Sequence, residues 1–264
     1  MNFLKGIIVG IGGIAPGLSG SALLVIFGLY EETISAIGTL FKDIKKNLIY
    51  LIPIIGGFGV GIILFSNIIN YFLTNYEVYT RFKFLGLVVG TVPLFYRETK
   101  KNGWSNTYYL PIAISFVLGL LLFFFNGDLF PRVASLNVLQ SIVLGVVVAG
   151  STIVPGVDSA TILSALGLYE IYLISINSFN ISVLLPAGLG LVVGALVISF
   201  FMNRLLETKY TLTFSIIFGL FLSIIPSVVN DSCTLGFNME SVICLLLMAI
   251  GFGVSLGLGK IKKQ

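Results

Sequence analysis

Long apolar stretches separated by short polar connectors make up most of the chain. Six of them approach or exceed the roughly 20 helical residues that span a hydrocarbon core of about 30 Å. They cover 47–73, 82–96, 108–126, 181–203, 211–229 and 241–259, and the second of them needs flanking residues to reach that length. The pattern predicts six transmembrane helices.

Two further apolar stretches are interrupted by small and polar residues. The interruptions read Pro16-Gly17-Leu18-Ser19-Gly20-Ser21 and Pro155-Gly156-Val157-Asp158-Ser159-Ala160. About 12 residues precede the first break, and at 1.5 Å each they reach roughly half-way across a bilayer. Non-helical backbone at that depth is tolerated only inside protein or beside a wet cavity. Each stretch is therefore either a broken spanning helix or a re-entrant hairpin.

These broken segments belong to an internal repeat. Twelve residues after the first proline comes Gly28-Leu29-Tyr30-Glu31, and twelve after the second comes Gly167-Leu168-Tyr169-Glu170. The offset is 139 residues here and 133 further on, where seven positions match in order: Leu51, Pro53, Gly57, Val60, Gly61, Gly86 and Pro93 with Leu184, Pro186, Gly190, Val193, Gly194, Gly219 and Pro226. The sequence predicts a single membrane domain, 1–264, made of a first repeat, 1–132, and a second repeat, 133–264.

The basic residues favour one form of the broken segments, because short cytoplasmic loops collect Lys and Arg. With both segments re-entrant, twelve basic residues lie on one side and three, Arg81, Lys83 and Arg132, lie on the other. With both segments spanning, the split falls to nine against six. We expect an all-α polytopic membrane protein with two inverted-topology repeats, each a re-entrant or broken helix hairpin plus three transmembrane helices. Both termini are expected in the cytoplasm.

The composition mainly excludes classes of protein and of chemistry. Only 10% of the residues are charged, against roughly 25% in soluble domains, and 57% are hydrophobic. Without histidine there is no Ser-His-Asp triad or histidine-bound metal, and Cys233 and Cys244 lack redox or zinc spacing. The net charge of +4 is not gathered in one stretch, and no ATP-binding loop is present. We expect no enzyme activity, cofactor, metal or nucleic-acid partner, and an oligomeric state that the sequence leaves open.

Each Pro-Gly break has the chemistry of a helix N-terminus opened for a ligand. Proline lacks an N–H, glycine permits close approach and serine caps, while the free N–H groups and the helix dipole favour phosphate or carboxylate. The candidate substrate-binding residues at the breaks are Gly17, Ser19, Gly20, Ser21, Gly156, Ser159 and Thr161. The competing interpretation is capping and close helix packing, which we favour for Gly10, Gly12, Gly13 and Gly190.

Charged residues near the breaks are candidates for coupling and capture. Asp158 lies at the second break and is the first candidate to bind a proton or cation, followed by Glu31 and Glu170, which otherwise mark where the hairpins leave the membrane. On the outer side Arg81 and Arg132 would capture a phosphorylated lipid head group, or serve as interfacial anchors.

The paired Pro-Gly-x-Ser-Gly-like breaks, each followed by Gly-Leu-Tyr-Glu, resemble those of the prokaryotic polyprenyl-phosphate translocases. The resemblance covers nearly the whole chain. It implies a transporter in the cytoplasmic membrane that returns undecaprenyl phosphate from the outer to the inner leaflet, with the broken segments as the substrate region and with proton or ion coupling. The second copy departs from the pattern by having Asp158-Ser159 in place of Ser-Gly, which favours coupling over phosphate binding for Asp158.

Two other classes of function share some of these features. An ion-coupled transporter of a small soluble anion would have the same breaks and repeat, but a closed central cavity in place of a lipid-facing cleft. An intramembrane enzyme acting on lipid would need paired carboxylates, and the nearest acid to Asp158 is the distant Glu170. We therefore expect a lipid phosphate as substrate and membrane lipids as surroundings.

Overall fold

The regular secondary structure of the described residues consists of helices alone. The computed structural model describes residues 1–14, 19–124, 136–157, 159, 162–163, 166–229, 233, 236 and 239–260. Gly17, Arg132, Asp158 and Thr161 lie outside the described residues.

Each of the six predicted apolar stretches falls on a helix. They are α4 (Ile44–Asn75), α5 (Glu77–Thr99), α6 (Tyr109–Phe124), α10 (Ile181–Thr208), α11 (Tyr210–Ile224, continued by the 3-10 helix η2, Ile225–Val228) and α12 (Met239–Lys260). The predicted segment 82–96 is extended at both ends in α5, as its length required. Within the described residues, all of these except α6 are long and apolar enough to cross a membrane.

The outer faces of the long helices are covered with large apolar side chains. Exposed examples on α4, α10 and α12 are Ile55, Ile63, Leu64, Leu185, Leu189, Leu245, Leu246 and Ile250. Soluble monomers rarely show continuous apolar surface on this scale, whereas lipid tails solvate it. The protein is therefore a multi-pass membrane protein.

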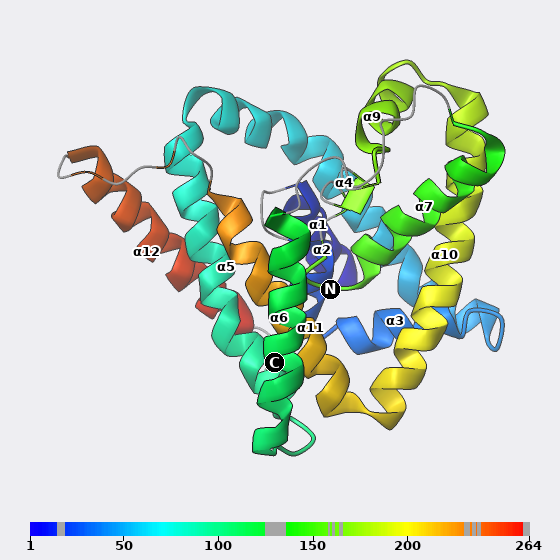
Figure 1. Cartoon of the computed structure of the whole chain (residues 1–264), viewed down its shortest axis with the longest axis horizontal. Helices are drawn as coiled ribbons and strands as arrows, with labels where there is room; N and C mark the ends of the chain where they lie inside the picture. The colour runs from blue at the N-terminus through cyan, green and yellow to red at the C-terminus, as the bar shows by residue number, and fades with distance from the viewer. Residues whose placement is uncertain are drawn as a thin grey trace.

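The Pro-Gly segments form shorter helices. The first contains α1 (Asn2–Ile14), α2 (Gly20–Ile26) and α3 (Tyr30–Gly38), and the second contains α7 (Val138–Ile153) and α9 (Tyr169–Asn177). Of these, α1 and α2 lie near the centre of the molecule (Figure 1). Between α2 and α3 the chain bends by 119°. Gly28 in this bend has φ 67° and its counterpart Gly167 has φ 69°, a left-handed conformation that glycine adopts without steric cost. The repeated glycine therefore makes the same turn in both segments.

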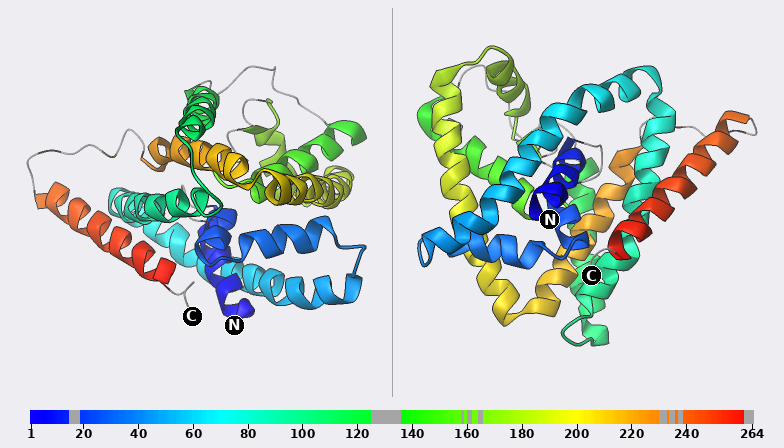
Figure 2. Two further views of the ribbon diagram at one scale, coloured as in Figure 1. Left: turned by 90° about the horizontal axis from the view of Figure 1, so that it is seen from below. Right: turned by 180° about the vertical axis from the view of Figure 1, so that it is seen from behind.

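The helices pack in two kinds of pair (Figure 1). Within each half, α1 lies along α4 and α7 lies along α10, while α5 lies along α12 and α6 along α11 across the halves. Figure 2 shows α12 at one edge of the molecule, beside α5. Close contacts hold the first kind of pair, because a Cβ at Gly57 would overlap the Phe3 carbonyl and a Cβ at Gly190 the Ile142 carbonyl. Gly10 also lies against α4, at Phe58, so Gly10 and Gly190 are packing glycines as expected.

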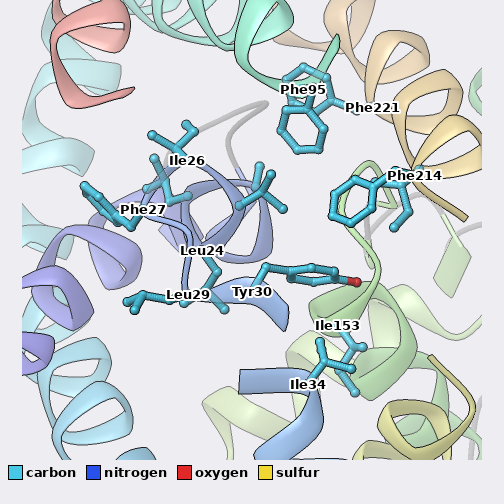
Figure 3. Packing of buried hydrophobic residues seen from close by; sticks show 14 of the residues in the cluster. Leu24, Ile26, Phe27, Leu29, Tyr30, Ile34, Phe95, Ile153, Phe214 and Phe221 are labelled. Atoms are coloured by element: carbon cyan, nitrogen blue, oxygen red, sulfur yellow. The ribbon is translucent and has the colours of Figure 1, made fainter. Parts of the chain in front are cut away.

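The largest core cluster surrounds the first broken segment (Figure 3). All α2 residues from Ser21 to Ile26 are buried. Phe95 of α5 stacks on Phe221 of α11, with 4.4 Å between ring centroids. Since α5 belongs to the first half and α11 to the second, this cluster joins the two halves around α2.

Candidate functional site

Ser19 and Ser21 form the start of α2 after the first break. The Ser19 hydroxyl oxygen accepts a hydrogen bond from the Ala22 N–H at 3.1 Å and lies 3.2 Å from the Ser21 hydroxyl. This is the expected N-cap, and it satisfies one of the free N–H groups of α2. The backbone at Gly20 lies against Val9, so α2 begins beside the middle of α1.

The second break follows α7 and packs on α11. Gly156 has φ 91°, and a Cβ there would overlap the backbone of Leu220 and Phe221. Only glycine combines this conformation with so close an approach. Ser159 is partly buried next to it. The structure also brings α2 into contact with α7, the helix that precedes the second break.

Arg81 connects α5 with the end of η2. Its Nε donates to Glu77 Oε1 at 2.9 Å, and its Nη1 donates to the Val228 carbonyl at 3.2 Å. The side chain is 21% exposed. Arg81 is thus held in place by protein groups and still reaches the surface, which is compatible with either a head-group contact or an anchor.

Glu31 belongs to a cluster of four polar side chains from three parts of the chain. Lys101 Nζ, in the connector after α5, lies 2.7 Å from Glu31 Oε1 and 3.1 Å from Glu98 Oε1. The Tyr210 hydroxyl, at the start of α11, lies 2.9 Å from the same two carboxylate oxygens. We call these residues the Glu31–Glu98 cluster.

Burial and charge act in opposite directions on Lys101. Partial burial lowers the pKa of its ammonium group, but the hydrogen bonds and negative charges of Glu31 and Glu98 outweigh this, so the pKa is raised. Glu98 itself is buried, with 8% of its side chain exposed. The sequence prediction included Glu31 but missed Glu98, Lys101 and Tyr210. An acid near the end of an apolar span was the available signal for Glu98.

Glu170 is placed far from this cluster. It is exposed on α9, and Figure 1 shows α9 near the upper edge of the molecule, whereas α3 lies lower, across α10. The two glutamates of the repeated motif are therefore not brought together. Within the described residues no three His, Cys, Asp or Glu side chains form a group suited to a metal ion.

A bundle of apolar spanning helices, with short broken helices meeting at its centre, is an architecture of membrane transporters. This chain belongs to the undecaprenyl phosphate translocase-like family, which it matches over residues 1–92 and 40–242. The family is named for transport and not for an enzymatic reaction. No solved structure matches the chain.

Two curated relatives are similar over most of their length. A protein from Staphylococcus aureus named polyprenyl-phosphate transporter is 25% identical, and the alignment covers 100% of this chain and 97% of that protein. A protein of the same name from Vibrio cholerae is 24% identical over 91% of this chain and 80% of its own length. The similarity extends through both halves, so it includes both broken segments.

Proposed function

We propose that the protein transports a polyprenyl phosphate, undecaprenyl phosphate in particular, from the outer to the inner leaflet of the bacterial cytoplasmic membrane. The observation that carries the proposal is the family match through both halves, together with the end-to-end similarity to a relative named polyprenyl-phosphate transporter. Two broken segments that meet at the centre of the bundle supply the place where a charged group would cross.

The inverted repeat is part of this proposal, and equivalent contacts support it. Gly86 on α5 lies against Met248 of α12, and Gly219 on α11 lies against Ser115 of α6. Gly219 lies 133 residues after Gly86, and Met248 lies 133 residues after Ser115. The two pairs therefore match when the partners from the two halves are exchanged. Residues 40–92 also fall in both family matches. Two copies of one fold, exchanging equivalent partners, would produce these relationships.

We place both termini in the cytoplasm and treat both broken segments as re-entrant. The fold-back of α2 onto α1 at Val9 supports a hairpin for the first segment. In Figure 1 the connector from α4 to α5, beside Arg81 and Lys83, lies at the opposite end from the connector between α10 and α11, beside Lys209. This separation agrees with the uneven distribution of basic residues.

The phosphate would be held by Gly17, Ser19, Gly20 and Ser21 of the first broken segment and by Gly156, Ser159 and Thr161 of the second. An isolated ion in a low-dielectric medium costs several kcal/mol or more. Backbone N–H groups and hydroxyls replace part of the lost hydration without adding a second charge. Arg81 and Arg132 would receive the head group at the outer surface, where a guanidinium can contact phosphate with two donors.

We further propose that transport is coupled to protons, with Glu31 as one coupling residue beside Asp158 and Glu170. The support is the arrangement of the cluster: the Tyr210 hydroxyl lies 2.9 Å from one carboxylate oxygen of Glu31 and from one of Glu98. Its single hydrogen can be donated to only one of the two at a time. Lys101 ion-pairs with both carboxylates, so two acids face one ammonium group, an arrangement suited to taking up and releasing a proton.

The other charged residues nearby have different neighbours. Lys100 lies over the rings of Tyr96 and Trp104, with its Nζ 4.2 Å and 4.9 Å from their centroids. Glu32 follows Glu31 on the exposed side of α3, and Lys209 directly precedes Tyr210. Lys101 is therefore the cation that ion-pairs with both carboxylates of the cluster.

The transport proposal is tested by binding and by movement of lipid. Purified protein should retain undecaprenyl phosphate in native mass spectrometry and release the corresponding alcohol. In proteoliposomes it should move the phosphate lipid between leaflets. Equal retention of the two lipids, or competition by free inorganic phosphate at similar concentration, would favour a transporter of a small soluble anion instead.

A further inference from the structure

The Tyr30 hydroxyl is a buried polar group without a hydrogen-bond partner. Tyr30 is 1% exposed, and its hydroxyl oxygen is one of three buried side-chain atoms in the described residues that lack a partner, with those of Ser199 and Ser255. Buried hydroxyls in native proteins nearly always find a partner, since an unmade bond costs the full desolvation of the group. The exception therefore needs a physical reason.

The hydroxyl lies in the region between the two broken segments. Tyr30 is the first residue of α3, directly after the bend that follows α2. Its ring packs edge-on to Phe214, with 6.1 Å between centroids. Figure 3 shows the hydroxyl end of Tyr30 directed to the side where Phe214 and Ile153 lie. Ile153 is the last residue of α7, and the second Pro-Gly break begins two residues later.

Packing alone does not account for a tyrosine at this position. The ring contacts Phe214 and belongs to an apolar cluster with Ile34 and Ile153, contacts that a phenylalanine would preserve. In the described structure the hydroxyl adds only the free-energy cost of its desolvation. Its counterpart in the second repeat, Tyr169, is partly exposed and so carries no such cost.

We propose that the Tyr30 hydroxyl is a substrate-binding group that donates a hydrogen bond to a phosphate oxygen of the lipid when the head group lies between the broken segments. The inference rests on the proposed function. A hydroxyl donating to an anionic oxygen makes a stronger bond than one between neutral groups. Because the phenol is neutral, it recognises the phosphate without leaving a buried charge in the empty protein.

The neutral donor also fits the rest of the site. The Ser19 hydroxyl oxygen accepts the capping hydrogen bond of α2, and one of the Ser19 and Ser21 hydroxyls can donate to the other, so the hydrogen of the second hydroxyl stays available to the phosphate. Tyr30 adds a further neutral donor, whose hydroxyl makes no hydrogen bond within the described structure. It distinguishes a phosphate monoester from the alcohol by charge, since the alcohol offers a weaker acceptor.

The test is Tyr30→Phe in the full-length protein, with Tyr169→Phe as the matched control. Undecaprenyl phosphate affinity should fall about tenfold or more in Tyr30→Phe, which corresponds to one charge-assisted hydrogen bond. Affinity should stay unchanged in Tyr169→Phe. The melting temperature of Tyr30→Phe should equal or exceed that of the wild type, because no bond is lost on folding.

The outcomes separate this inference from the proposed function. Wild-type binding with equal binding by Tyr30→Phe overturns the role of Tyr30 and leaves the transport proposal intact. A clear drop in melting temperature in Tyr30→Phe shows that the hydroxyl is already bonded within the protein, and overturns the inference as well. Failure of the wild type itself to bind undecaprenyl phosphate overturns both.

Discussion

Lys101 and Glu31, seventy residues apart in the chain, form an ion pair with 2.7 Å between Nζ and Oε1. The pair fastens the first turn of α3 to the connector after α5. Both side chains are almost half exposed, at 47% and 42%, and exposed ion pairs contribute little to stability. The ion pair therefore contributes little to the stability of the fold, and it can break and re-form at little cost during transport.

Glu98→Gln should remove much of the pH dependence of transport. Glutamine keeps the size of the side chain and resembles the protonated acid, so the cluster no longer exchanges a proton. Initial rates of lipid movement in proteoliposomes, measured from acidic to alkaline pH, would show a flattened profile. The matched control is Glu207→Gln on α10, because Glu207 is exposed and bonded to Asn203 at 2.8 Å.

Asp158→Asn gives the comparison for the other coupling candidate. If Asp158→Asn changes the pH profile of transport and Glu98→Gln does not, the coupling site lies at the second break and not in the Glu31–Glu98 cluster. An unchanged profile in Asp158→Asn would remove Asp158 from that role.

Lys101→Met should shift the pH profile of transport to higher pH. Loss of the positive charge favours the protonated form of the neighbouring carboxyl pair, so the proton is released at a higher pH. The same transport assay measures the midpoint. Lys100→Met is the control, because Lys100 lies over aromatic rings and has no ion pair with the cluster in the described structure. A shift to lower pH in Lys101→Met would contradict proton exchange at the cluster.

The raised pKa of Lys101 has a consequence for stability at alkaline pH. Its folded pKa lies above the usual value of 10.5, so its contribution is complete below the unfolded pKa and is lost as the pH rises through the folded value. The difference in melting temperature between wild type and Lys101→Met should therefore vanish above this range. At neutral pH the difference in free energy of unfolding should be small, about 1 kcal/mol or less. A difference that grows with pH would contradict the assignment.

Gly57→Ala and Gly190→Ala should destabilise the protein by similar amounts. Each added methyl would overlap a carbonyl on the helix packed against it, and such overpacking costs about 1–3 kcal/mol. Gly59→Ala and Gly188→Ala are matched controls on the same helices, because a Cβ at either position has nothing within 4 Å. Thermal unfolding in detergent measures all four, and equal melting temperatures would argue against the close contacts.

Cysteine labelling in cells tests the proposed sidedness. In a chain with Cys233 and Cys244 replaced by alanine, Lys45→Cys should react only after the membrane is permeabilised, and Asn180→Cys should react in intact cells. Both positions are exposed, and neither replacement removes a capping hydrogen bond. The reverse pattern would invert the topology.

Most of the helices could be predicted because their cause is local. An apolar run of membrane length must be helical to satisfy its own backbone, and the extension of segment 82–96 followed from the same requirement. The repeated Pro-Gly and Gly-Leu-Tyr-Glu motifs fixed the positions of the breaks and bends. Ser19 was expected to cap α2, and it does.

The Glu31–Glu98 cluster could not be predicted in the same way, because its members meet only in three dimensions. Tyr210 lies 179 residues from Glu31 and 112 from Glu98. In the sequence Lys101 is one of the twelve basic residues assigned to the cytoplasmic side, and Glu98 lies just beyond the predicted span 82–96. Tyr30 was hidden for another reason: in a chain that is 13% aromatic, nothing in the sequence separates a ring with an unbonded hydroxyl from an ordinary core residue.

The pairing of α5 with α12 has a consequence for how the protein is made. The carbonyl of Met248 faces Gly86, so α5 completes its packing only against α12, a helix of the second half. During synthesis α5 therefore enters the membrane long before its partner exists. Until α12 is synthesised, the glycine-lined face of α5 is exposed to lipid or to chaperones. A chain that is truncated before α12 leaves this face of the first half without its partner.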